Sequence, residues 1–302
     1  MPDKTDASWL SGLYVPVTTP FDPVTGDAEP VSLRDNLRRW LEQPIDGFVL
    51  FGSTGEGALL EDEEKVRLME YARDVVPRDH GLVAGAGADS TRGVIRIARR
   101  LAEAGAEAVL VHAPVYYGPV LSAHAVREHF TAVADGSPVP VLLYFMPKYV
   151  HVELEPGLVA ELLRHPNIVG LKDSSGDLKR FAEYTNACDE DARLFVGNGT
   201  LLYSALELGA AGGILAAGLL AGTAYGQLIR YFREDRAQEA GTIQERLTNV
   251  HREVVGGTGI GGIKAGLDLL GFTGGPPRPP LLPASDKDRQ RVERVLRNAR
   301  LL

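Results

Sequence analysis

The chain has 302 residues, of which 44% are hydrophobic and 24% are charged, and its formal net charge at pH 7 is -8. This composition is ordinary for a globular protein, and the excess of acidic residues argues against a nucleic-acid-binding surface and against binding to anionic membranes. Cys188 is the only cysteine, so no disulfide can form within the chain, and we expect a cytoplasmic protein.

Short apolar runs alternate with longer segments of helical periodicity along most of the chain. We predict strands at residues 13–17, 47–51, 82–86, 108–111, 139–144, 168–172, 193–196 and 212–216. A helix is expected after each strand, near residues 33–41, 62–76, 91–101, 122–134, 156–164, 178–188, 201–208 and 219–232. Strands that are apolar on both faces and are separated by helices form a parallel sheet. Eight such units predict an α/β protein with the fold of a (β/α)8 TIM barrel.

Local signals refine this prediction. Ser32 and Ser90 precede helical segments, and their hydroxyls are expected to cap the first turns. In the second helix, Val66, Met69 and Ala72 recur at the spacing of one face and are expected to point toward the core. An open, doubly wound sheet is the alternative fold, but no dinucleotide-binding fingerprint follows any of the strands.

The last part of the chain carries three more helical patterns, near residues 237–255, 260–270 and 286–298. A proline-rich stretch at residues 274–280 joins the last two patterns and predicts a rigid turn, because proline has a fixed backbone geometry. We therefore expect a barrel at residues 1–236 and a C-terminal helical extension at residues 237–302 that packs on the barrel.

A lysine ends the sixth predicted strand, in the sequence Asn-Ile-Val-Gly-Leu-Lys-Asp at residues 167–173. This residue, Lys172, stands out because the chain has 7 lysines against 25 arginines. Burial disfavours the ammonium form, and a neutral amine can attack a carbonyl carbon to form a Schiff base. The alternative is a lysine at a strand end whose ammonium group simply reaches solvent.

The loop after the second strand reads Gly-Ser-Thr-Gly-Glu-Gly at residues 52–57. In a barrel of this kind, chemistry takes place at the carboxyl ends of the strands. Two hydroxyls among glycines can present donors to an anion, and the absence of Lys and Arg from the loop favours a carboxylate over a polyphosphate. Glu56 is interpreted as a charge in the first turn of a helix, without a chemical role. The alternative is a loop that only connects strand and helix.

Tyrosines follow two further strands. Tyr144 ends the fifth strand, where its phenol can act as proton donor and acceptor or can be a core aromatic. The pair Tyr116 and Tyr117 follows the fourth strand and is interpreted as packing or interface residues. The histidines show no metal-ligand spacing and are interpreted as solvated helix positions, so no metal site is expected. They are His80, His112, His124, His129, His151, His165 and His251.

Taken together, these motifs resemble the dihydrodipicolinate synthase/N-acetylneuraminate lyase family of class I, pyruvate-dependent aldolases. The matching parts are residues 52–56, the pair Tyr116 and Tyr117, Tyr144 with Pro147, and residues 170–173. Their order and spacing match over nearly the whole chain. Within the family, residues 134–140, 165–174 and 271–276 look most like those of 4-hydroxy-2-oxoglutarate aldolase.

The resemblance implies a set of roles. Lys172 would form an imine with a 2-oxo acid such as pyruvate, and Tyr144, Thr54 and Tyr117 would form a hydroxyl relay as the other catalytic residues. Tyr117 would reach in from a neighbouring subunit of a homodimer or homotetramer. The partners would be a small 2-oxo acid and an aldehyde, and the covalent lysine imine would take the place of any metal or organic cofactor. The substrate-binding residues would be Ser53, Thr54, Gly55, Tyr149, Ser174, Asn198 and Ile214.

One segment departs from the family. In the synthase branch, an arginine two residues after the equivalent of Pro147 binds the second substrate, and this chain has Tyr149 there. The neighbouring asparagine is replaced by Phe145, and a Thr-Gly pair by Val150 and His151. Loss of this bidentate donor argues against dihydrodipicolinate synthesis, and the segment with Lys148, Tyr149 and His151 is unusual for a strict aldolase as well. The function that the resemblance implies is that of a class I aldolase with pyruvate as one partner, similar to 4-hydroxy-2-oxoglutarate aldolase. The alternatives are 4-hydroxy-tetrahydrodipicolinate synthase, a sugar-acid dehydratase that uses the same imine, and a barrel that binds a ligand without turnover.

Overall fold

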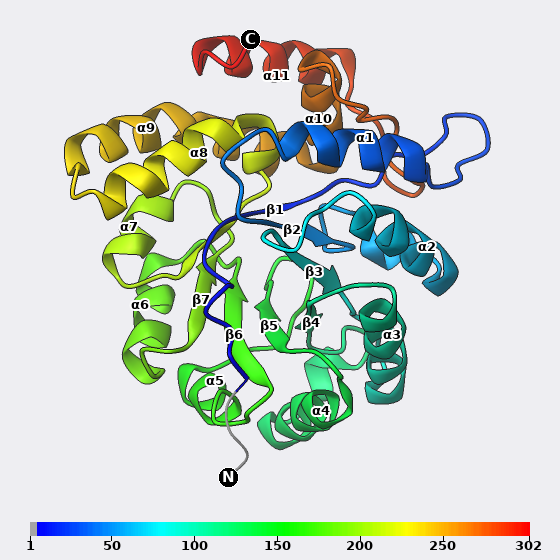
Figure 1. Cartoon of the computed structure of the whole chain (residues 1–302), viewed down its shortest axis with the longest axis vertical. Coiled ribbons are helices and arrows are strands. Elements are labelled where there is room, and N and C mark those ends of the chain that lie inside the picture. The colour runs from blue at the N-terminus through cyan, green and yellow to red at the C-terminus, as the bar shows by residue number, and fades with distance from the viewer. Residues whose placement is uncertain (1–4) are drawn as a thin grey trace.

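Eight parallel strands close into a barrel in sequence order, and helices surround it (Figure 1). The computed structural model describes residues 5–302, so residues 1–4 of the predicted barrel part lie outside the described chain. The predicted (β/α)8 TIM barrel is confirmed. The strands are β1 Gly12–Pro16, β2 Gly47–Leu50, β3 Gly81–Gly85, β4 Ala108–His112, β5 Val141–Phe145, β6 Ile168–Asp173, β7 Arg193–Val196 and β8 Gly212–Ile214.

One α-helix follows each strand on the outside of the barrel. These helices are α1 Pro30–Trp40, α2 Asp62–Arg73, α3 Thr91–Glu103, α4 Ala123–Gly136, α5 Pro156–Leu162, α6 Leu178–Ala187, α7 Leu202–Glu207 and α8 Gly218–Arg233. Two short 3-10 turns, η1 Gly57–Leu59 and η2 Gly118–Val120, lie in the loops after β2 and β4. No helix among residues 5–302 is long and apolar enough to cross a membrane.

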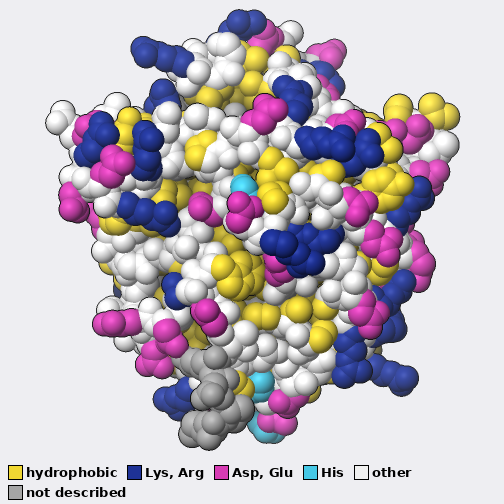
Figure 2. Space-filling view, in the orientation of Figure 1, with side chains coloured by type: hydrophobic (Ala, Val, Ile, Leu, Met, Phe, Trp, Pro, Cys, Tyr) yellow, Lys and Arg dark blue, Asp and Glu magenta, His cyan; other side chains and the backbone are white. Residues whose placement is uncertain are grey.

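Two layers of buried side chains hold the barrel together. The larger layer lies between the strands and the helices, and the smaller one fills the barrel interior. Ala7 and Leu10 belong to the interior layer, so the first residues of the described chain close one end of the barrel. The outer surface carries acidic and basic side chains interspersed over the face seen in Figure 2.

The sixth strand contains a bulge that changes the direction of its side chains. Val141 of β5 pairs with Ile168, but the next residue, Leu142, pairs with Gly170. Val169 is therefore an extra residue in β6, and such an insertion reverses the inward and outward alternation beyond it. Ile168 packs in the outer layer before the bulge, whereas Lys172 beyond it points into the barrel mouth beside Tyr144.

The C-terminal helices differ from the prediction in one segment. The expected helix at residues 237–255 is α-helical only in α9, Ala237–Asn249, and a π-helix, η3 Val250–Gly256, replaces its last turns. The chain continues through α10, Gly257–Leu269, and α11, Asp286–Asn298. In Figure 1, α9 runs beside α8, and α11 lies beyond α10 at the C-terminal end. The division into parts at residue 237 stays a prediction.

The predictions about helix caps and faces have mixed outcomes. Ser90 caps α3 as expected, because its hydroxyl accepts a hydrogen bond from Gly93 N at 3.1 Å. The expectation for Ser32 is wrong, since α1 already begins at Pro30, a residue whose fixed φ favours the first helical position. In α2, Met69 and Ala72 are buried as predicted, whereas Val66 is only half-buried, and Lys65 and Leu68 complete the inward face.

Candidate active site

A cavity of about 230 Å³ opens at the carboxyl ends of the strands. It brings together eight of the ten predicted site residues from five different strand ends and the loops that follow them. These residues are Ser53, Thr54, Tyr144, Tyr149, Lys172, Ser174, Asn198 and Ile214. Gly55 and Tyr117 do not line it.

Lys172 lies at the centre of this cavity. Its side chain is only 4% exposed, and its Nζ lies 4.5 Å from the centre of the Tyr144 ring. Tyr144 and Lys172 are direct partners in the pairing of β5 with β6, so their side chains lie side by side at the same height of the barrel. No carboxylate within residues 5–302 forms an ion pair with Lys172, which leaves the amine facing the cavity.

The backbone of the loop after β2 is unusual at both ends. Phe51 and Glu56 have positive φ angles of 58° and 56°, a region that residues other than glycine rarely occupy. Gly57 must be a glycine, because a Cβ atom there would collide with the carbonyl oxygen of Phe51. This tight loop places the Ser53 hydroxyl 3.4 Å from the Tyr144 hydroxyl.

Tyr117 is the predicted catalytic residue that lies outside the cavity lining. It is 64% exposed and packs edge-on against Tyr116, with ring centres 5.0 Å apart. The loop that carries both residues is held by Asp89, whose carboxylate accepts hydrogen bonds from the backbone N–H groups of Val115 and Tyr116. Within one chain, Tyr144 therefore has Ser53 rather than Tyr117 as its hydroxyl neighbour.

His251 is a site residue that the sequence analysis missed. It lies in the π-helix η3 and lines the cavity, and its Nδ1 accepts a hydrogen bond from Gly199 N at 3.1 Å. Burial lowers its pKa to about 4, so the ring is neutral at pH 7 and carries its proton on Nε2. Helical periodicity could not have found this contact, because the π-helix changes which side chains share a face.

The interpretation of the histidines as solvated helix positions is also wrong for several other residues. His112 ends β4, and no helix contains His80, His151 or His165. His129 is 5% exposed, and its Nδ1 lies 2.9 Å from the Thr91 hydroxyl. Burial lowers its pKa to about 4. His129 does not line the cavity, so its position between α3 and α4 is a matter of packing.

The side of the cavity away from the β2 loop carries neutral hydrogen-bond donors, among them Asn198 and Tyr149, and one cation, Lys148. The Asn198 side-chain oxygen accepts from the backbone and hydroxyl of Thr200, which leaves its amide N–H groups for a ligand. Tyr149 is 47% exposed at the rim, with the ammonium group of Lys148 5.4 Å from its ring centre. Among residues 5–302, no arginine lines this cavity.

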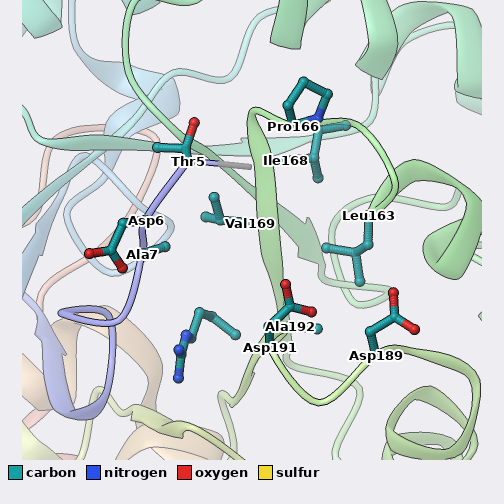
Figure 3. Close-up of a pocket in the computed structure, with 11 residues that line it drawn as sticks. Thr5, Asp6, Ala7, Leu163, Pro166, Ile168, Val169, Asp189, Asp191 and Ala192 are labelled. Atoms are coloured by element: carbon teal, nitrogen blue, oxygen red, sulfur yellow. The ribbon is translucent and has the colours of Figure 1, made fainter. Parts of the chain in front are cut away.

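A cavity at the other end of the barrel contains none of the predicted site residues (Figure 3). Its volume is about 180 Å³, and it lies between the N-terminal segment and the beginning of β6. Ile168 and Val169 line it, whereas Lys172 lies at the opposite end of the same strand. This cavity is therefore separate from the candidate active site.

Comparisons with known proteins agree on one family. The model of the dihydrodipicolinate synthetase family matches residues 9–299. A 4-hydroxy-tetrahydrodipicolinate synthase of Syntrophus aciditrophicus is 31% identical over 293 residues, which are 97% of this chain and 99% of that protein. One of Methanothrix thermoacetophila is 33% identical over 288 residues, covering 94% and 95% of the two chains.

A solved structure extends this similarity to three dimensions. The chloride-inhibited dihydrodipicolinate synthase of Acinetobacter baumannii, complexed with pyruvate, superposes with a TM-score of 0.91 at 26% sequence identity. The similarity covers 97% of this chain and 100% of that chain. The whole barrel and its C-terminal helices are therefore shared.

The buried state of His251 predicts a pH dependence of stability. Its pKa of about 4 lies below the ordinary value of 6.5, so the unfolded chain binds more protons and stability falls as the pH falls from 6.5 toward 4. Between pH 7.5 and pH 5, replacing His251 by Asn should reduce this loss by about 2 kcal/mol. Urea unfolding at the two pH values measures the difference.

The control for this experiment is His124→Asn, because His124 is exposed on α4. That variant should lose stability with falling pH as the parent protein does. If His251→Asn showed the same pH dependence as this control, the ring would not be held neutral by burial.

Proposed function

Because the chain belongs to the dihydrodipicolinate synthetase family and is an enzyme of the carbon–carbon lyase type, we propose that Lys172 forms a Schiff base with a 2-oxo acid. The observation that carries this proposal is a buried lysine without a carboxylate partner among residues 5–302, which faces Tyr144 in a cavity at the barrel mouth. Pyruvate is the first candidate, a choice supported by the pyruvate complex of the Acinetobacter baumannii relative.

The first steps form the imine. The substrate carboxylate binds to the hydroxyls and backbone N–H groups of Ser53 and Thr54, which line the cavity. The neutral amine of Lys172 attacks the keto carbon, and loss of one water molecule from the carbinolamine leaves an iminium. The chemistry needs no metal or organic cofactor, because the iminium itself withdraws electrons from the substrate.

The following steps break or form a carbon–carbon bond. Electrons of the bond between the third and fourth carbons flow into the iminium, which releases an aldehyde and leaves the enamine of pyruvate on Lys172. In the opposite direction, the enamine attacks an aldehyde. Tyr144 gives and takes the protons as general acid and base, and the Ser53 hydroxyl 3.4 Å away orients its phenol.

The second substrate has two candidates. The curated relatives support 4-hydroxy-tetrahydrodipicolinate synthase, which is the name that they carry. The resemblance to 4-hydroxy-2-oxoglutarate aldolase gains no support from these relatives. One observation argues against the synthase: the rim carries Tyr149 where the synthase branch is expected to have the arginine that binds the second substrate, so the aldolase stays a candidate. We therefore place the synthase first and the aldolase second.

Activity assays separate these candidates. Consumption of pyruvate with aspartate semialdehyde would identify the synthase, whereas release of pyruvate from 4-hydroxy-2-oxoglutarate would identify the aldolase. A sugar-acid dehydratase would form its product without releasing pyruvate. If none of these substrates reacted with a folded protein that forms the imine, both assignments of the second substrate would be wrong.

For the assembly, we infer a homo-oligomer, either a dimer or a tetramer. The loop after β4 exposes several apolar side chains, with Tyr116 78% and Val120 79% exposed, and exposed aromatic residues are typical of interfaces. In such an assembly Tyr117 would complete the hydroxyl relay of a neighbouring copy with Tyr144 and Ser53, which takes the position next to Tyr144 that was expected for Thr54. Light scattering tests this inference, and a mass of 32.5 kDa, that of one chain, would contradict it.

The Schiff base predicts a covalent adduct on one lysine. Reduction with borohydride in the presence of pyruvate should label Lys172, and peptide mass spectrometry should find the reduced adduct on that residue. Lys65 and Lys264 are also buried and serve as internal controls that should stay unlabelled. The variant Lys172→Met should lose both the adduct and turnover, and an adduct on another lysine would contradict the assignment.

The role of Tyr144 predicts a loss of rate without a loss of fold. Tyr144→Phe removes only the hydroxyl, and a missing proton relay typically lowers turnover by about 10²–10⁴-fold. Steady-state kinetics measure the change, with the melting temperature as a control for folding. Ser53→Ala should have a smaller effect, because it removes only a neighbour of the phenol. Turnover of Tyr144→Phe near that of the parent would exclude Tyr144 as the acid and base.

A further inference from the structure

A buried ion pair joins the loop after β2 to the C-terminal helices. Glu56 and Lys264 have side chains that are 0% and 1% exposed, and the Lys264 Nζ lies 2.6 Å from Glu56 Oε1. Lys264 belongs to α10, which is more than 200 residues away in sequence. The sequence-based interpretation of Glu56 as a charge in a first helical turn is therefore wrong, because this carboxylate points into the protein.

Each partner of the ion pair makes further hydrogen bonds. The ammonium group of Lys264 also donates to the carbonyl oxygens of Thr19 and Pro276, both at 2.8 Å. The other carboxylate oxygen of Glu56 accepts a hydrogen bond from Arg278 N at 2.8 Å. The pair thus connects the loop after β1, the loop after β2 and the segment after α10.

The ion pair lies next to the groups that bind the substrate carboxylate in the proposed function. Glu56 is two residues after Thr54, and its N–H donates to the carbonyl oxygen of Ser53 at 3.3 Å. Its left-handed backbone is unfavourable for a residue with a side chain, by about 1–2 kcal/mol. The loop therefore needs an external interaction to keep this shape, and the contact with Lys264 supplies one.

The ion pair also lies next to the part of the cavity wall that is formed by α10. Ile260 and Ile263 of α10 line the cavity together with Ser53 and Thr54, and Lys264 directly follows Ile263. The ion pair therefore joins two walls of one cavity, below the place where the substrate would bind.

We propose that Glu56 and Lys264 are positioning residues, whose buried ion pair holds the Ser53–Thr54 loop in the geometry that binds the substrate carboxylate. This inference rests on the proposed function. A role in stability alone explains the pair less well, because a buried ion pair is often no more stabilising than apolar residues of similar volume. Its position at a strained loop beside the site is what a positioning role requires.

The test compares Glu56→Gln, Lys264→Met and the double variant with the parent protein. The readout is the pyruvate concentration that gives half of the maximal rate of borohydride trapping on Lys172, together with that maximal rate. Because a small misplacement of a binding group weakens binding strongly, the half-saturating concentration should rise roughly tenfold or more in all three variants. The maximal trapping rate should change much less.

Thermal unfolding of the same proteins separates positioning from stability. Each single variant leaves one uncompensated buried group, whereas the double variant leaves a neutral pair and should recover part of the lost melting temperature. Its half-saturating pyruvate concentration should nevertheless stay raised. If Lys264→Met alone failed to fold, Glu56→Gln and the double variant would still decide the question.

The matched control is Asn36→Ala, which weakens a different attachment of the C-terminal segment. The Asn36 side chain on α1 exchanges hydrogen bonds of 2.8 and 2.9 Å with the backbone of Thr273, and neither residue lines the cavity. The pyruvate dependence of this variant should equal that of the parent protein. If the half-saturating concentration instead followed the melting temperature across all variants, or did not change, the positioning role would be wrong. Absence of any adduct in the parent protein would overturn the proposed function and this inference with it.

Discussion

The direction of Lys172 depends on the bulge at Val169. Side chains alternate between the two faces of a strand, and Ile168 points outward toward the helices. Without the bulge, Lys172, four residues further on, would point outward as well. The extra residue shifts the alternation, so that Gly170 and Lys172 pair with the inward-facing Leu142 and Tyr144 of the neighbouring strand. The proposed chemistry needs the amine and the phenol in one cavity, and this single insertion places them there.

Around this pair the cavity has two sides of different chemistry. The loop after β2 presents backbone N–H groups and the hydroxyls of Ser53 and Thr54, which suit a carboxylate. The other side presents the neutral His251 ring and the amide of Asn198, which suit hydroxyl or carbonyl oxygens. In the proposed function, the first side would hold the 2-oxo acid and the second side would face the second substrate.

Whether a prediction was right depended on how far apart in the sequence the interacting residues lie. Ser90 acts on an N–H group three residues away, and its cap was predictable. Ser32 lies inside the first turn, because α1 begins at Pro30 and Glu29 holds the N-cap position. His251 and Glu56 were misjudged because a distant segment covers each of them, His251 in part and Glu56 completely. For His251 that segment is the turn at Gly199, and for Glu56 it is α10.

The amino-acid sequence by itself determined the barrel, because alternating apolar runs and amphipathic segments can bury their faces only as strands and helices of one layered fold. It also determined which residues lie at the strand ends, and hence most of the cavity lining. Only the tertiary structure decided the inward turn of Lys172, the pairing of Tyr144 with Ser53 rather than Tyr117, and the burial of Glu56 against Lys264. Those features depend on a bulge and on contacts between distant segments of the chain, and neither leaves a periodic signal.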